Sequence, residues 1–173
     1  MKTEQHRAFI QAMLGGVLAG ISLSGNNSFL MPLALACLWA VSYSPLAGAL
    51  WGWIAVLVSH RWLLALHPIS WVGVSESLSL PITISIWLFC GFFGACLVGV
   101  WSFLGNFFQS SRFKSLVSKN QISLVIFLSC LWGLAEVVLA HGPLFWIGVG
   151  TSLLPSDRWL AGLARLFGAG GLA

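Results

Sequence analysis

The sequence predicts an all-α integral membrane protein with about five full transmembrane helices, an incomplete sixth and a cytoplasmic N-terminus. Of its 173 residues, 58% are hydrophobic and 7% are charged, whereas a soluble domain carries roughly 25% charged residues. The mean hydropathy is +0.94. The charges fall in clusters that leave long neutral gaps, and a central Arg, Lys or Asp would cost about 2.5–3.5 kcal/mol in a bilayer. A water-soluble protein is therefore excluded.

The first three apolar runs predict helices near residues 8–24, 29–42 and 46–66. Hydrophobic sequence continues after the first run, which favours a retained helix over a cleavable signal peptide. The second run barely spans a bilayer at about 1.5 Å per residue. The third is a full span, since a crossing needs about 20 apolar residues.

The last three runs predict helices near residues 80–108, 122–140 and 159–173. The run at 80–108 is long enough to tilt across the membrane, and the run at 122–140 is a full span. The final run is short, rich in Gly and carries Arg165. All six helices form one transmembrane domain over residues 1–173.

The distribution of basic residues predicts the orientation. Lys and Arg gather in cytoplasmic loops, and the candidates here are Lys2, Arg7, Arg112, Lys114 and Lys119. The N-terminus and the 109–120 loop then share the cytoplasmic side, so the short run at 29–42 must be a real crossing. The loops at 61–79 and 141–158 face outward. The formal net charge of +4 is mainly loop charge, and no nucleic acid partner is expected.

The two outward loops have similar chemistry. The first contains Trp71, and the second contains Phe145 and Trp146. Trp is enriched at membrane interfaces in any membrane protein, so an aromatic belt is one interpretation. The other is a surface at the outer leaflet against which acyl chains lie.

Glu136 is the ionisable residue of greatest interest, because an acidic group at membrane depth is a functional-site hypothesis by default. The alternative is a helix-end carboxylate that reaches the interface or pairs with Arg61 or His141. The candidate substrate-binding residues are Trp71, Glu136, Phe145 and Trp146.

No catalytic residue, metal site or cofactor is expected. The four cysteines lie inside apolar runs without Cys-x-x-Cys spacing, and packing roles are favoured for them: Cys37, Cys90, Cys96 and Cys130. The Gly-Val-Gly-Thr-Ser at 148–152 is out of register with a Gly-x-Ser-x-Gly nucleophile elbow. All Lys residues belong to the expected cytoplasmic side.

The C-terminal part of the chain resembles the membrane region of bacterial apolipoprotein N-acyltransferases. The resemblance is carried by a Leu-Trp…Glu helix, an aromatic loop with a small-residue tail and a following Gly-Leu-Ala…Gly. The matching residues are Leu131, Trp132, Glu136, Pro143, Phe145, Trp146, Gly148, Gly162, Leu163, Ala164 and Gly168. The family's Phe-Pro-Trp order is altered here to Pro-Leu-Phe-Trp. Upstream, Trp71 matches a conspicuous Trp of the family's outer loop.

The resemblance implies a function in lipoprotein maturation. Such enzymes move an acyl chain from a phospholipid, through a thioester on a Cys, to the α-amino group of a diacylated lipoprotein's N-terminal Cys. The reaction takes place at the outer face of the bacterial cytoplasmic (inner) membrane, and the catalytic Glu, Lys and Cys lie in a nitrilase-like domain after the seventh helix. The implied partners are the phospholipid donor, the diacylated lipoprotein and membrane lipids.

The chain ends at Ala173, inside the expected sixth helix. We therefore expect a fragment that lacks the nitrilase-like domain and is inactive alone. A small non-catalytic membrane protein, such as the substrate-binding subunit of a vitamin transporter, is the alternative. The length favours such a subunit, because 173 residues would then be a complete chain. The block at 131–168 favours the acyltransferase.

Overall fold

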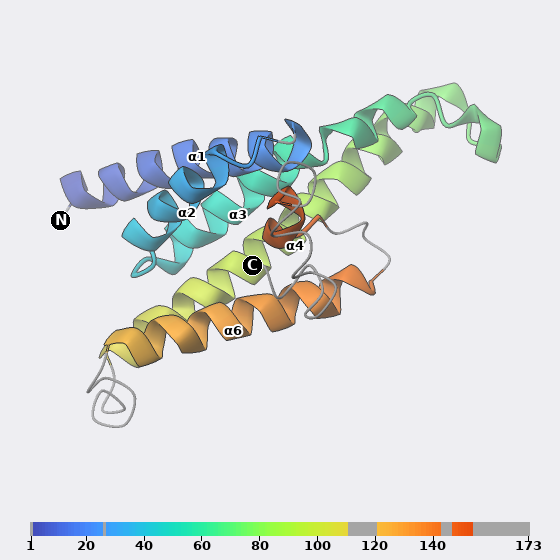
Figure 1. Cartoon of the computed structure of the whole chain (residues 1–173). Coiled ribbons are helices and arrows are strands. Elements are labelled where there is room, and N and C mark those ends of the chain that lie inside the picture. The colour runs from blue at the N-terminus through green and yellow to red at the C-terminus, as the bar shows by residue number, and fades with distance from the viewer. Residues whose placement is uncertain (1, 26, 111–120, 143–146, 154–173) are drawn as a thin grey trace.

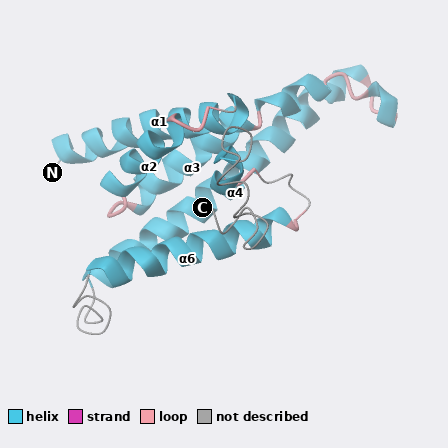
Figure 2. Ribbon diagram, in the orientation of Figure 1, coloured by secondary structure: helices cyan, strands magenta, loops and turns pink. Residues whose placement is uncertain are grey.

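The long apolar runs of the sequence form helices in a computed structural model of the chain, which describes residues 2–25, 27–110, 121–142 and 147–153. Helices satisfy their backbone hydrogen bonds internally, as a bilayer demands. No β-strand occurs among these residues (Figure 2). The predicted all-α class is confirmed. The helix expected at 159–173 lies outside the described residues.

The N-terminal part of the chain forms three adjacent helices (Figure 1). They are α1 (Lys2–Gly25), α2 (Leu30–Ala40) and α3 (Pro45–Ser59). Ser44 caps α3, because its Oγ accepts a hydrogen bond from the Ala47 backbone N–H at 3.4 Å. Pro occupies the first turn of α3, where its missing N–H needs no partner.

The second half of the described chain contains two long helices, α4 (Glu76–Ser110) and α6 (Gln121–Ala140). Three short 3-10 helices complete the secondary structure: η1 (Arg61–Leu66), η2 (Ser70–Val72) and η3 (Val149–Leu153).

The helix α3 ends at Ser59, whereas the expected range ran to residue 66. His60 leaves the helix with φ −95° and ψ 14°, and its buried ring Nδ1 lies 2.9 Å from the Ser59 Oγ. The chain continues as η1 and then meets Pro68. A proline disfavours the α conformation of the residue before it, and η1 ends at Leu66, directly before His67 and Pro68.

The helix α4 starts at Glu76, four residues before the expected range, and contains Pro81. Two hydroxyl groups in the turn after this proline donate back to helix carbonyls. The Thr83 Oγ1 donates to the Ser79 carbonyl at 2.9 Å, and the Ser85 Oγ donates to the Pro81 carbonyl at 2.8 Å. Such side-chain donors help a helix in lipid to tolerate an internal proline.

Glycines bring α3 into close contact with α1 and α4. A methyl group on Gly20 would lie 2.4 Å from the Val58 Cβ, and one on Gly52 would lie 2.2 Å from the Gly94 carbonyl oxygen. Small residues at such crossings allow helix backbones in membranes to approach closely. The helix α3 is therefore the central element of the bundle.

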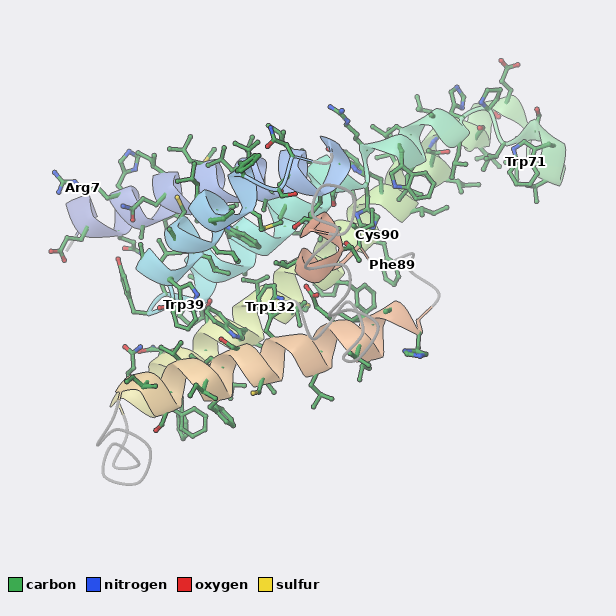
Figure 3. The ribbon with its side chains drawn as sticks, viewed as in Figure 1. Arg7, Trp39, Trp71, Phe89, Cys90 and Trp132 are labelled. Atoms are coloured by element: carbon green, nitrogen blue, oxygen red, sulfur yellow. The ribbon has the colours of Figure 1, made fainter. Side chains whose placement is uncertain are left out.

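Four tryptophans join α6 to the other helices. We call Trp39, Trp51, Trp101 and Trp132 the indole cluster. The ring centroids of Trp39 and Trp101 lie 5.0 Å apart, those of Trp101 and Trp132 lie 5.7 Å apart, and all three contacts in the cluster are edge-to-face. Edge-to-face pairs are favourable beyond their burial. Figure 3 shows Trp39 and Trp132 between α6 and the N-terminal helices.

Three helices of the described chain are long and apolar enough to cross a membrane, judged by length and composition: Glu4–Gly25, Glu76–Gln109 and Ile122–Ala140. The helices α2 and α3 are shorter apolar elements. The start of α1, the α2–α3 turn, the end of α4 and the start of α6 lie at one end of the bundle (Figure 1). The expected topology requires this arrangement.

The segment between α3 and the middle of α4 projects past the other helices (Figure 1). We call residues 61–86 the outer arm. It starts where α4 parts from α3, near the hydrogen bond of 2.8 Å from the Trp87 Nε1 to the Leu57 carbonyl. Trp71 lies at its tip with 76% of its surface exposed (Figure 3).

Candidate functional site

The described residues place one carboxylate deep inside the bundle. Glu136 lies on α6 and is 3% exposed. Its Oε1 accepts hydrogen bonds from the Trp132 Nε1 at 2.8 Å and from the Val149 backbone N–H at 2.5 Å. Its Oε2 accepts from the Gly150 backbone N–H at 3.4 Å. The carboxylate thus joins α6 to η3, which lies later in the sequence.

Neither alternative partner named from the sequence binds this carboxylate. The ring Nδ1 of His141 lies 2.7 Å from the Val137 carbonyl, on the exposed surface. Within the described residues, no ion pair links Glu136 to Arg61 or His141. The buried carboxylate is satisfied by N–H donors instead, as a buried polar group requires.

Small residues in η3 allow its backbone to reach Glu136. A methyl group on Gly148 would lie 2.4 Å from the Glu136 Oε2. The Thr151 and Ser152 hydroxyls donate to the carbonyls of Gly148 and Val149 at 2.5 Å and 2.7 Å, which holds the turn together. The sequence Gly-Val-Gly-Thr-Ser is therefore a carboxylate-binding turn.

A second contact fixes η3 at its far end. The Ser28 Oγ, in the connection between α1 and α2, donates to the Ser152 carbonyl at 2.9 Å. The turn is thus held between Glu136 of α6 and Ser28 of the α1–α2 connection. These two residues lie more than a hundred positions apart in the sequence.

The four predicted site residues do not form one cluster in the described chain. Trp71 lies at the tip of the outer arm, far from the Trp132 and Glu136 pair (Figure 3). Phe145 and Trp146 lie outside the described residues. Only Glu136 is placed among the buried contacts. The substrate-binding role of these four residues stays a prediction.

Two contributors to the Glu136 site were not predicted as site residues. Trp132 and Gly148 were named only as part of the family resemblance. The spacing of Trp132 and Glu136, four residues apart, places both on one helix face and could have indicated their contact. The Val149 and Gly150 donors are backbone groups, and no side-chain pattern announces them.

One Ser–His pair occurs in the outer arm. The His67 Nδ1 lies 2.8 Å from the Ser79 Oγ, which also accepts a hydrogen bond from the Ile69 backbone N–H at 2.8 Å. Ser79 is fully buried, so its oxygen is not accessible to a substrate. The pair fastens η1 and η2 to α4 and is a structural contact.

The described residues contain no group of three or more His, Cys, Asp or Glu side chains placed to hold a metal ion. The four thiols within the same ranges are free: Cys37 lies on α2, Cys90 and Cys96 lie on α4, and Cys130 lies on α6. The contacts that the structure describes at Glu136 are hydrogen bonds.

Curated relatives match most or all of this chain. Two relatives from strains of Prochlorococcus marinus are 53% and 50% identical to it, and each match covers 100% of this chain and 35% of the relative. A relative from Parasynechococcus marenigrum is 46% identical over 95% of this chain and 34% of its own length. All three are named apolipoprotein N-acyltransferase.

This chain therefore spans about a third of the length of the curated relatives it matches. No family model matches the chain. No solved structure matches it either. Along its whole length the chain is related in sequence to apolipoprotein N-acyltransferases, and the resemblance predicted from residues 131–168 is confirmed.

Proposed function

We propose that this chain is the membrane scaffold of an apolipoprotein N-acyltransferase. The observation that carries the proposal is the 53% identity to such a protein over all 173 residues. The scaffold works at the outer face of the bacterial cytoplasmic membrane, which the chain crosses several times. There it holds a phospholipid acyl donor and a diacylated lipoprotein close together. The vitamin-transporter alternative gains no support from the relatives.

The four predicted residues have distinct roles in this proposal. Trp71, exposed at the tip of the outer arm, contacts lipid or lipoprotein at the outer leaflet. Glu136 positions the outward turn at 147–153 through its backbone hydrogen bonds. Phe145 and Trp146 contact an acyl chain in the segment next to that turn.

Acyl transfer itself is not assigned to this chain. Transfer through a thioester requires a nucleophilic Cys next to a base. The four thiols within the described ranges lie inside apolar helices, and the Lys residues, at positions 2, 114 and 119, belong to the expected cytoplasmic side. We expect the purified chain to transfer no acyl group above background.

A chimera tests the proposal. This chain replaces the aligned third of the Prochlorococcus relative, and transfer from phosphatidylethanolamine to a diacylated lipopeptide is measured in proteoliposomes. We expect the chimera to retain activity within about tenfold of the parent. This factor corresponds to a change of about 1.4 kcal/mol in the activation free energy. The matched control carries the same junctions with the chain's Gly148 changed to Leu, which would push η3 off Glu136. An inactive chimera that inserts and folds normally would contradict the proposal.

A further inference from the structure

The chain between η1 and η2 is fastened to α4 at one buried hydroxyl group. Ser79 is fully buried, and its Oγ accepts a hydrogen bond from the Ile69 backbone N–H at 2.8 Å. The half-buried ring of His67 places its Nδ1 2.8 Å from the same oxygen. Among the described residues, the Ser79 side chain makes no other hydrogen bond. The direction of the contact with His67 is therefore set by the single proton of the hydroxyl.

The Ser79 proton points to the His67 ring. A hydroxyl group has one hydrogen and two lone pairs, whereas a backbone N–H can only donate. The Ile69 N–H uses one lone pair, which leaves the Ser79 proton for the His67 Nδ1. If this Nδ1 carried a proton as well, the Ser79 proton would lose its acceptor, and a buried donor without an acceptor is costly. The fastened arm thus requires a neutral His67 with its proton on Nε2.

Two other histidines at the outward end make the opposite contact. The His60 Nδ1 lies 3.2 Å from the Val56 carbonyl oxygen. The His141 Nδ1 lies 2.7 Å from the Val137 carbonyl oxygen. A carbonyl oxygen can only accept, so Nδ1 is the donor in both contacts. Protonation leaves these two Nδ1–H donors in place, whereas in His67 it replaces an acceptor with a donor.

The described arm provides no charge that compensates for a protonated His67. The elements packed around this ring are η1, η2 and the first turns of α4, and their charged side chains are Arg61 and Glu76. His60 precedes η1 and is the other titratable group. Within these described elements, neither Arg61 nor Glu76 forms an ion pair with His67. An imidazolium here would lose a hydrogen bond and gain no carboxylate in return.

We propose that protonation of His67 releases the chain between η1 and η2 from α4, so that the outer arm opens in acid. The fastened arm accepts only the neutral ring, whereas the open arm accepts either form, and protons therefore favour the open arm. An unperturbed histidine titrates near about pH 6.5. The fastening is complete above this range and is lost as the pH falls through it. Because the loop at 61–79 is expected to face outward, the external medium controls the arm.

Hydrogen exchange tests this proposal. The whole chain is placed in nanodiscs, and exchange of the Ile69 amide is followed by mass spectrometry from about pH 8 to about pH 5, where histidines titrate. Rates are corrected for the intrinsic effect of pH on amide exchange. We expect protection of Ile69 to fall several-fold, and by at most about tenfold per pH unit, the limit for uptake of one proton. The amides of α3 should keep their protection and show that the bundle stays folded.

Two histidine variants give the matched comparison. His67→Asn offers an amide oxygen to the Ser79 proton and does not titrate, so we expect protection of Ile69 in H67N without a fall in acid. His141→Asn removes an exposed histidine on α6, and the fall should remain. Where H67N fails to fold, Ser79→Ala decides, because S79A should exchange fast at every pH while the unchanged chain loses protection only in acid.

Ring nitrogen chemical shifts provide a second readout, since the His67 proton should lie on Nε2 at about pH 8. Three results would overturn the proposal: a proton on the His67 Nδ1 at that pH, equal protection of Ile69 across the interval, and a fall in acid that persists in H67N. These measurements need no acyl transfer. An inactive chimera would therefore reject the proposed function and leave the behaviour of the arm unaffected.

Discussion

The Glu136 carboxylate shows how one polar side chain organises an apolar region. Three N–H groups from α6 and η3 converge on it, and in low dielectric such charge-assisted bonds are strong because water cannot compete. The same environment makes any unpaired donor costly. Substitutions at this position therefore act on two segments at once.

We predict that Glu136→Gln lowers the free energy of unfolding by about 1–3 kcal/mol, because its amide nitrogen cannot accept a hydrogen bond and leaves a buried N–H unpaired. Thermal unfolding in detergent, followed by circular dichroism, measures the change. The control is Glu76→Gln, on an exposed carboxylate in the first turn of α4, which should change little. Equal stability of E136Q and the unchanged chain would show that the carboxylate contacts contribute nothing.

Gly148 provides a second test of the same site. We predict that Gly148→Ala destabilises the chain by about 1–3 kcal/mol, the usual range for overpacking, because its methyl group would lie 2.4 Å from the Glu136 Oε2. Gly25→Ala is the matched control, since a methyl group there meets no atom within 4 Å. Unfolding midpoints of the two variants measured side by side decide the point, and coincident midpoints would refute the close contact.

At the scale of the elements, the sequence predicts the runs that are helical better than their ends. Apolar content marks 46–66 as one run, but it cannot tell an α-helix from the 3-10 turn that begins at Arg61. The change occurs where the His60 ring contacts the Ser59 hydroxyl, a local contact that apolar content does not report. The contacts of Glu136 with η3 were not predictable for a related reason: their donors are backbone groups thirteen and fourteen residues away.

In the outer arm, the Ser79 hydroxyl contacts the His67 ring and accepts a hydrogen bond from the Ile69 backbone N–H. We predict that Ser79→Ala speeds hydrogen exchange of the Ile69 amide by about 5- to 150-fold, since an unpaired buried N–H costs about 1–3 kcal/mol and 1.4 kcal/mol is a factor of ten. Exchange measured by mass spectrometry on residues 61–80 checks this. Ser77→Ala, at an exposed serine, should leave the exchange unchanged. Slow exchange in S79A would mean that Ser79 does not hold the arm.

At the scale of the whole molecule, the shortest helix decides the topology. The helix α2 has 11 residues, about 16 Å at 1.5 Å per residue, whereas the hydrocarbon core is about 30 Å thick. It lies beside α1 and α3 (Figure 1), and the expected topology depends on its crossing the membrane there. Short spans are accommodated by local thinning of the bilayer.

The orientation follows from counting α2 as a crossing, and two single cysteines test it in a background without the native thiols. We predict that Ser75→Cys, exposed at the outer arm, reacts with a membrane-impermeant maleimide in intact spheroplasts. Ser115→Cys, in the 109–120 loop, should react only after lysis, because Arg112, Lys114 and Lys119 hold that loop in the cytoplasm. If α2 did not cross, the two positions would exchange sides relative to the N-terminus. Labelling of S115C in intact spheroplasts would therefore reject the topology.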